Sequence, residues 1–192
     1  MKNIEQELKL LLTQQEYDIL SKLTTNLPQL QTNFYFQAEQ RHDPNVMVRI
    51  RQKNDGFLLC YKSRISSCQG VTVCDERECQ LQSNLAQTFL QRGITAAELN
   101  AMLQTDFEQT FVCAGKMDTY RTTFLWQNWR LELDKSIYLG TCDYELECEC
   151  QSVPLLEQLK QLLNSTFGLE LRYSLPKMQR FFERKERLKN EV

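Results

Sequence analysis

The strongest constraint on the fold is an alternation of charged and apolar residues in the segment 143–150. Here Glu145, Glu147 and Glu149 alternate with tyrosine, leucine and cysteine. Side chains of a β-strand point alternately to its two faces, so the three carboxylates share one face. Carboxylates in such a row repel each other and destabilise the strand unless a cation lies among them. The segment therefore predicts a β-strand with one apolar face and one acidic face that holds a cation.

Residues 4–11 repeat this design near the start of the sequence. Glu5, Glu7 and Lys9 lie on one face of the predicted strand, whereas the opposite face is mainly apolar. A charged face in contact with water is the usual arrangement of an amphipathic strand. Two acidic strands in a chain of 192 residues favour a metal site instead.

Two further segments, 46–53 and 57–64, carry positive charge. The turn signal Asn54-Asp55-Gly56 between them predicts a β-hairpin. One face of this hairpin carries basic side chains, namely Arg49, Arg51, Lys53 and Lys62. Cations placed so closely repel one another, so the hairpin indicates a site that expects an anion.

The other predicted elements are strands and helices that alternate along one domain, residues 1–192. Strands are expected at 31–38, 71–81, 119–126 and 129–134, with a loop at 65–70. Capping boxes at Thr13–Glu16 and Thr95–Glu98 predict two helix starts, the first helix ending at Pro28. Further helices are expected at 83–92, from 154 to about 168, and from about 176 onward. The acidic residues Glu76, Glu78, Glu132 and Asp134 lie on strand faces in this pattern.

Nearly every predicted strand has one apolar face and one charged face, which indicates an α+β fold. A closed antiparallel barrel would turn the apolar faces outward beneath the helices and the charged faces toward a lumen. Acids in such a lumen require a divalent metal, and bases require a polyanion. Carboxylate ligands without histidine select hard ions, so Mg²⁺ or Mn²⁺ is the expected cofactor. A metal–triphosphate complex is the simplest ligand that satisfies both the acids and the bases of the lumen.

Charge and cysteine usage limit the partners. A net charge of −2 and a pI of about 5.6 argue against nucleic acid and membrane surfaces as partners. No apolar run of transmembrane length and no signal peptide are visible, so a cytoplasmic protein is expected. The eight cysteines lack zinc-site spacing and indicate reduced thiols, and His42 is the single histidine. Both a monomer and a homodimer remain open.

An ordered set of motifs resembles the CYTH superfamily, the triphosphate tunnel metalloenzymes. Glu5-Gln6-Glu7-Leu8-Lys9 matches its ExExK signature, and the resemblance extends over nearly the whole chain. The matching segments are Val48-Arg49-Ile50-Arg51, Leu59-Cys60-Tyr61-Lys62, Thr119-Tyr120-Arg121, Leu133-Asp134 and Tyr144-Glu145-Leu146-Glu147-Cys148-Glu149, with Lys177 and Arg180 on the last helix. Small stand-alone members from Gram-positive bacteria are the most similar. One departure is Tyr35-Phe36-Gln37-Ala38, where the family often has Y-F-D-T.

The resemblance implies an eight-stranded antiparallel closed β-barrel, or tunnel, with helices packed outside. It implies that phosphate oxygens are bound by Lys9, Arg49, Arg51, Lys62, Arg121, Lys177 and Arg180. Metal ligands would be Glu5, Glu7, Glu76, Asp134, Glu145, Glu147 and Glu149, with Glu132 as a further member. Lys9, Glu7 and Glu147 are the expected catalytic residues.

The implied activity is metal-dependent hydrolysis of inorganic triphosphate or a related triphosphorylated small molecule. A class IV type adenylate cyclase and a thiamine triphosphatase are alternative enzymes that use the same tunnel. A sensor that binds polyphosphate or a nucleotide without catalysis is the alternative from another class. The acidic residues argue against the sensor, because binding an anion requires only the bases.

Overall fold

The computed structural model describes residues 3–39, 43, 45–54, 56–68, 71–150, 153–173 and 175–191, with the side chains of 3–5 and 153 left out. The strands are β1 (Asn3–Leu12), β2 (Gln29–Ala38), β3 (Val46–Lys53), β4 (Gly56–Cys68), β5 (Val71–Leu81), β6 (Phe111–Trp126), β7 (Trp129–Tyr138), β8 (Thr141–Glu149) and β9 (Arg172–Tyr173). The helices are α1 (Gln14–Ser21), α2 (Ser83–Arg92), α3 (Ala96–Leu103), α4 (Val153–Phe167) and α5 (Lys177–Asn190).

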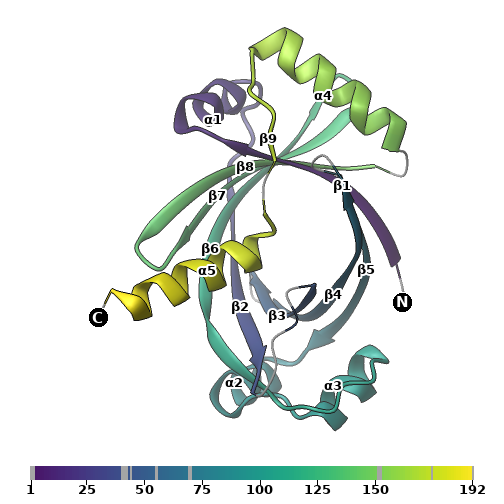
Figure 1. Ribbon diagram of the computed structural model, residues 1–192, viewed down its shortest axis with the longest axis vertical. Coiled ribbons are helices and arrows are strands. Elements are labelled where there is room, and N and C mark those ends of the chain that lie inside the picture. The colour runs from purple at the N-terminus through teal and green to yellow at the C-terminus, as the bar shows by residue number, and fades with distance from the viewer. Residues whose placement is uncertain are drawn as a thin grey trace.

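Strands β1 to β8 form a closed antiparallel barrel, as expected from the sequence (Figure 1). The order around the ring is β5-β4-β3-β2-β6-β7-β8-β1, and pairing of β1 with β5 closes it. Strands β3 and β8 therefore lie at opposite positions around the ring. The short β9 pairs with β1 at Leu10 and Leu11, beyond the part of β1 that pairs with β5.

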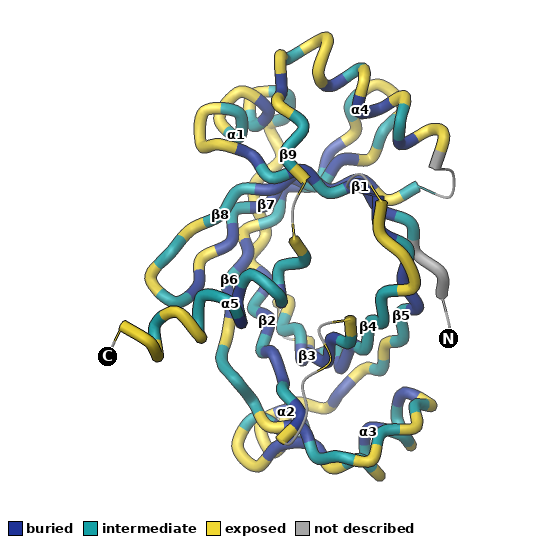
Figure 2. The backbone as a smooth tube through the Cα atoms, in the orientation of Figure 1, coloured by how far each residue is buried: buried dark blue, intermediate teal, exposed yellow. Residues whose placement is uncertain are grey.

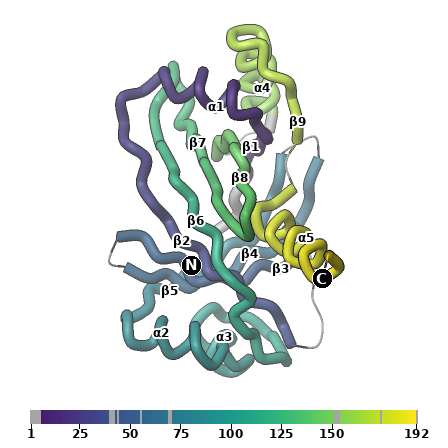
Figure 3. The backbone as a smooth tube through the Cα atoms, turned by 90° about the vertical axis from the view of Figure 1, so that its left-hand side faces the viewer, coloured from purple at the N-terminus to yellow at the C-terminus, as the bar shows by residue number. Residues whose placement is uncertain are grey.

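The apolar faces of the strands point outward and are covered by helices at two places. Helix α4 packs Leu156, Leu159 and Leu163 with Leu8 and Leu10 of β1 in one core. A second core contains side chains of β2, β3 and β4 together with α2 and α3. Figure 3 shows α1 and α4 at one end of the molecule and α2 and α3 at the other. Figure 2 shows that residues along the barrel strands are mostly buried or intermediate. With the apolar faces outside, the charged faces line the lumen.

Helix α5 packs against the barrel through a third apolar cluster. This cluster joins Tyr35 of β2 to Met178, Phe181 and Phe182 of α5, and the rings of Phe181 and Phe182 pack against the ring of Tyr35. Gly115 permits this close approach, because a Cβ atom there would lie 2.8 Å from the ring of Phe181. The helix carries Lys177 into the lining of the lumen, whereas Arg180 contacts Asp143 and Glu145 of β8.

Several predicted boundaries were wrong. Helix α1 starts at its capping box but ends at Ser21, well before Pro28. Residues 65–68 of the predicted loop at 65–70 belong to β4, because Ser66, Ser67 and Cys68 continue its pairing with β5 after a bulge, and residues 69 and 70 lie outside the described residues. The strand that contains 119–126 begins at Phe111, and β7 continues to Tyr138. Pairing with neighbouring strands, which is absent from local sequence, extends each of these strands. The single domain over 1–192 stays a prediction.

Candidate active site

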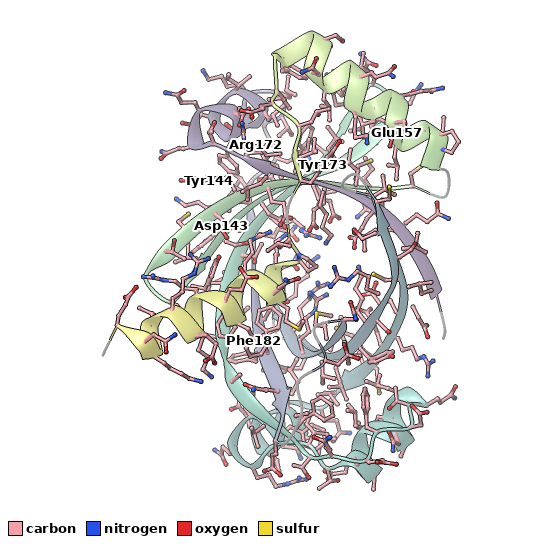
Figure 4. The ribbon with its side chains drawn as sticks, in the orientation of Figure 1. Asp143, Tyr144, Glu157, Arg172, Tyr173 and Phe182 are labelled. Atoms are coloured by element: carbon pink, nitrogen blue, oxygen red, sulfur yellow. The ribbon has the colours of Figure 1, made fainter. Side chains whose placement is uncertain are left out.

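The lumen of the barrel contains a cavity of about 590 Å³. Its basic lining residues are Lys9, Arg49, Arg51, Lys62, Arg64, Arg121 and Lys177, and its acidic ones are Glu7, Glu76, Glu78, Glu132, Glu147 and Glu149. Figure 4 shows polar side chains that project from the strands into the ring. The charges are segregated: one side of the lumen concentrates acids and their cations, and the other side carries arginines.

We call the first side the acidic wall, defined as Glu7 of β1, Glu132 and Asp134 of β7, and Glu145 and Glu147 of β8. Antiparallel pairing places these residues in one patch, because Glu132 pairs with Glu147 and Asp134 with Glu145. Lys9 lies directly opposite Glu147 on the next strand. Five acids at such spacing would repel each other without cations among them.

Lysines provide part of that neutralisation. The Nζ atom of Lys9 lies 3.0 Å from Glu147 and 3.1 Å from Glu7. Lys62 approaches from β4, and its Nζ atom donates to Glu7 at 2.7 Å. Burial alone would lower the pKa of Lys9, but Glu147, Glu7 and Glu145 together raise it well above its ordinary value. Lys9 is therefore a fixed positive charge between two carboxylates.

Arg121 of β6 is held by three acids of the wall. Its Nε and Nη2 atoms donate to the two carboxylate oxygens of Asp134 at 2.8 and 2.6 Å. Nη2 also donates to Glu147 at 2.5 Å, and Nη1 donates to Glu132. This two-pronged contact with Asp134 is the strongest geometry that arginine forms with a carboxylate. Its charge is thus matched by acids of the protein itself.

Helix α5 adds two more cations. The Nζ atom of Lys177 contacts Glu147 at 2.7 Å, Asp134 at 2.9 Å and Glu145. Arg180 donates to Glu145 at 3.1 Å and to Asp143 of β8 at 2.9 Å; Asp143 is labelled near α5 in Figure 4. Burial would raise the pKa of Glu145, but Lys177 and Arg180 outweigh it and lower the pKa to about 2. The same kind of competition lowers the pKa of Glu147 well below its usual range.

The opposite side of the lumen is the basic wall, defined as Asn33 and Tyr35 of β2 and Arg49 and Arg51 of β3. Tyr35 pairs directly with Arg49, and Asn33 with Arg51. The contact between Arg49 and Glu76 is long, at 3.9 Å, and the Nε atom of Arg49 is buried with no hydrogen-bond partner among the described residues. Arg51 donates from Nε to the amide oxygen of Asn33 at 3.2 Å. The pKa of Arg51 is lowered by burial and by the charges of Arg49 and Arg121.

The donor set suits a hard metal ion that is also held by a substrate. Among the described residues, no group of three or more histidine, cysteine or acidic side chains could hold a metal by itself. Mg²⁺ is commonly bound by one or two carboxylates together with substrate phosphates. Glu7 and Glu147 fit this role, because both line the cavity and both contact Lys9.

The structure brings together most of the residues selected from the sequence. Glu76 and Glu149 line the same cavity as Lys9 and its neighbours. Asp134, Glu145 and Arg180 lie behind this lining and join it through Lys177 and Arg121. The backbone of Glu5 pairs with Cys74, but its side chain lies outside the described residues.

Sequence reasoning missed several cavity residues. The uncharged ones include Gln31, Asn33, Tyr35, Thr72, Cys74 and Thr119, and the charged ones are Arg64 and Glu78. Arg64 follows Lys62 by two positions, so strand alternation could have placed it on the same face. Amides and hydroxyls have no comparable signal, because such residues are common on any strand that contacts water.

A closed antiparallel barrel with acids and bases around its lumen defines the class of tunnel-barrel proteins. The model of the CYTH domain matches residues 3–182, so the chain belongs to the CYTH family. The resemblance seen in the sequence motifs is confirmed.

Individual relatives agree with this assignment. The candidate triphosphatase YjbK of Bacillus subtilis (strain 168) is 28% identical over 193 residues, covering 96% of this chain and 97% of that protein. The crystal structure of a candidate adenylate cyclase from Bacillus halodurans is 26% identical with a TM-score of 0.75, over 94% and 98% of the two chains. HpAC1 from Hippeastrum, described as an adenylyl cyclase candidate with a dominant triphosphatase activity, has a TM-score of 0.75 at 23% identity, over 93% of this chain and 95% of that chain.

Among the described residues, no helix is long and apolar enough to cross a membrane.

Proposed function

We propose that the protein hydrolyses inorganic triphosphate, or a related small triphosphorylated molecule, with the help of Mg²⁺ or Mn²⁺. The observation that carries this proposal is the division of the lumen into two walls. The acidic wall is matched by lysines and arginines of the protein, whereas the arginines of the basic wall have few acidic partners. A buried cation without a counter-charge is unfavourable, so this wall is suited to a polyanion. The similarity to YjbK supports a triphosphatase.

Phosphate oxygens would contact the basic wall and the cations that bridge the two walls. Arg49 and Arg51 can grip oxygens with two donors each, which fits a planar guanidinium. Lys62, Lys9, Arg121, Lys177 and Arg180 supply further positive charge, each already oriented by an acid. Arg49 and Arg51 would cancel charge of the substrate, whereas the cations that are already paired with acids would help to position its terminal phosphate.

Glu7 and Glu147 would hold the metal, with Glu5, Glu76, Asp134, Glu145 and Glu149 as the other proposed ligands. Between these carboxylates, a divalent metal would supply electrostatic stabilisation of the charge that develops on the triphosphate. Because its pKa is held so low, Glu147 is a weak proton acceptor, and its part is to hold the metal and Lys9 in place. Water attacks the terminal phosphorus, and the bond between this phosphorus and the oxygen that bridges it to the middle phosphorus breaks. Phosphate and pyrophosphate then leave. Positioning and electrostatics account for most of the lowering of the activation barrier in such a reaction.

A small anionic substrate and a reducing compartment fit the rest of the chain. All eight cysteines are free thiols, which suits the cytoplasm. We therefore propose a cytoplasmic enzyme whose partner is a small triphosphate rather than a nucleic acid or a membrane.

A panel of substrates tests the proposed activity. Phosphate release is measured with inorganic triphosphate, thiamine triphosphate and ATP, each with Mg²⁺ or Mn²⁺, while cyclic AMP is assayed in parallel. We expect phosphate from inorganic triphosphate with either metal and slower turnover of ATP. Cyclic AMP without phosphate release from inorganic triphosphate would identify a cyclase. Tight binding of triphosphate without turnover would identify a sensor.

A further inference from the structure

Two arginines that line the lumen are oriented in different ways. Arg121 is gripped by a carboxylate, with Nε and Nη2 donating to Asp134 at 2.8 and 2.6 Å. Arg51 is oriented by an amide, with Nε donating to Asn33 at 3.2 Å. Asn33 is only 3% exposed and stands directly opposite Arg51 on the neighbouring strand. The two contacts are alike in using Nε, but only the first one neutralises the guanidinium.

The surroundings of Arg51 do not replace the missing charge. No described acidic side chain forms an ion pair with Arg51. The groups near it include the like charges Arg49 and Arg121, which are only partly offset by Cys60 and Glu76. Burial and these two like charges both disfavour the positive charge of Arg51. The terminal amino groups of Arg51 have no hydrogen-bond partner in the part of the chain that the structure describes. An anion that enters the cavity would relieve this cost.

We propose that Asn33 is a positioning residue that orients Arg51 without neutralising it. Its amide oxygen fixes Nε, which leaves the two terminal amino groups of the guanidinium to bind a substrate phosphate. A carboxylate at this position would orient Arg51 equally well but would cancel the charge that the substrate needs. The inference rests on the triphosphate binding proposed above, and it assigns a specific task to an uncharged residue on β2.

The decisive variant is Asn33→Asp, which preserves the size of the side chain and its acceptor oxygen. If Asn33 had a structural role alone, the carboxylate would satisfy Arg51 better and the variant would bind triphosphate normally. We expect instead that the KM and the Kd for inorganic triphosphate rise by about tenfold or more, which is the loss of one charge-assisted contact. The kcat should change less than KM, and the Tm should be unchanged or higher.

Two controls separate the effect of position from the effect of charge. Gln161→Glu converts an exposed amide of α4 to a carboxylate outside the barrel and should leave KM unchanged. In an Arg51→Ala background, Asn33→Asp should add little further loss, because a residue that acts through Arg51 has no effect once Arg51 is removed. Isothermal titration with inorganic triphosphate measures the Kd of the wild type and of these four variants.

Each outcome decides between the proposals. Normal binding by Asn33→Asp together with weakened binding by Arg51→Ala would overturn the role of Asn33 and leave the proposed function standing. An equal additional loss in the Arg51→Ala background would show that the new charge does not act through Arg51. Absence of triphosphate binding by the wild-type protein would overturn both proposals. If Asn33→Asp fails to fold, Asn33→Leu takes its place, because it removes the amide oxygen that orients Arg51. A several-fold rise in the Kd for inorganic triphosphate supports the proposal, and an unchanged Kd overturns it.

Discussion

The acidic wall and the basic wall face each other across one lumen, yet they satisfy their charges differently. On the acidic wall, every buried carboxylate contacts a lysine or an arginine, as Glu147 does with Lys9, Arg121 and Lys177. On the basic wall, Arg51 has an amide for a partner. Among the described residues, Arg49 contacts the thiol of Cys60 and one distant carboxylate, Glu76 at 3.9 Å. In the first arrangement the protein neutralises its own charges, and in the second, according to the proposed function, the charge is left for a ligand. Stability and affinity should therefore respond to different mutations.

The largest effect is expected for Glu147→Gln on the acidic wall. The variant leaves Lys9, Arg121 and Lys177 with less compensating charge, so the free energy of unfolding should fall by about 3–5 kcal/mol. Triphosphatase activity should be lost as well, because this residue is a proposed metal ligand. Urea unfolding and phosphate release measure the two effects.

Glu149→Gln is the matched control for stability, because it makes the same change two positions along β8 at an exposed site. Its unfolding free energy should change by less than about 0.5 kcal/mol. If Glu147→Gln were as stable as the wild type, the cations of the acidic wall would not depend on that carboxylate.

The pH dependence of stability tests the same wall through Glu145. Its pKa is lowered to about 2 in the folded protein, against about 4.3 in an unfolded chain. The resulting stabilisation is fully present above about pH 5 and is lost progressively as the pH falls toward 2. This one group should contribute about 3 kcal/mol over that interval. Unfolding free energies at pH 5, 4 and 3 should decline more steeply for the wild type than for Glu145→Gln, and equal slopes would contradict the assignment.

Arg51→Ala on the basic wall should weaken binding by about 1.5–3 kcal/mol, which is roughly a 10- to 150-fold rise in KM. Its Tm should hold or rise, because the variant removes a buried cation near two like charges. Arg51→Lys should restore binding only in part, since an ammonium cannot present the planar pair of donors. Lys53→Ala, at the exposed end of the same strand face, should have little effect. An unchanged KM for Arg51→Ala would remove this residue from the substrate site.

The smallest predicted effect concerns triphosphate without metal. If the basic wall binds the anion, inorganic triphosphate in the presence of a chelator should stabilise the wild type by about 1.4 kcal/mol at ten times its Kd. The stabilisation should be much smaller for Arg51→Ala at the same concentration. An equal shift in both proteins, measured by thermal unfolding, would place metal-free binding elsewhere.

Local sequence was sufficient for the faces of the strands and for most of the charged site. Alternation with a period of two placed Glu145, Glu147 and Glu149 on one face, and the ordered motifs indicated the family that the match over residues 3–182 confirms. Capping boxes correctly marked the starts of α1 and α3, because a cap needs only four consecutive residues. The ends were less predictable: β4 continues through Cys68 because β5 pairs with it.

The partners of the charges depended on the tertiary structure. The sequence showed a row of acids that required a cation, and we expected a metal ion in that role. In the structure the cations among these acids include Lys9, which is 138 residues away from Glu147, and Lys177 on the last helix. Closure of the barrel brings these distant segments together, and no local pattern encodes which segments will meet.

The sequence by itself thus determined the identity of the charged faces, because side-chain alternation is a property of each strand alone. Only the tertiary structure decided which of those charges cancel and which remain for a ligand. That outcome depends on register across the ring, which sets Asp134 beside Arg121 and an uncharged Asn33 beside Arg51. Coulomb energies fall with distance and rise with burial, so an arginine opposite a carboxylate is neutralised, whereas one opposite an amide keeps its charge.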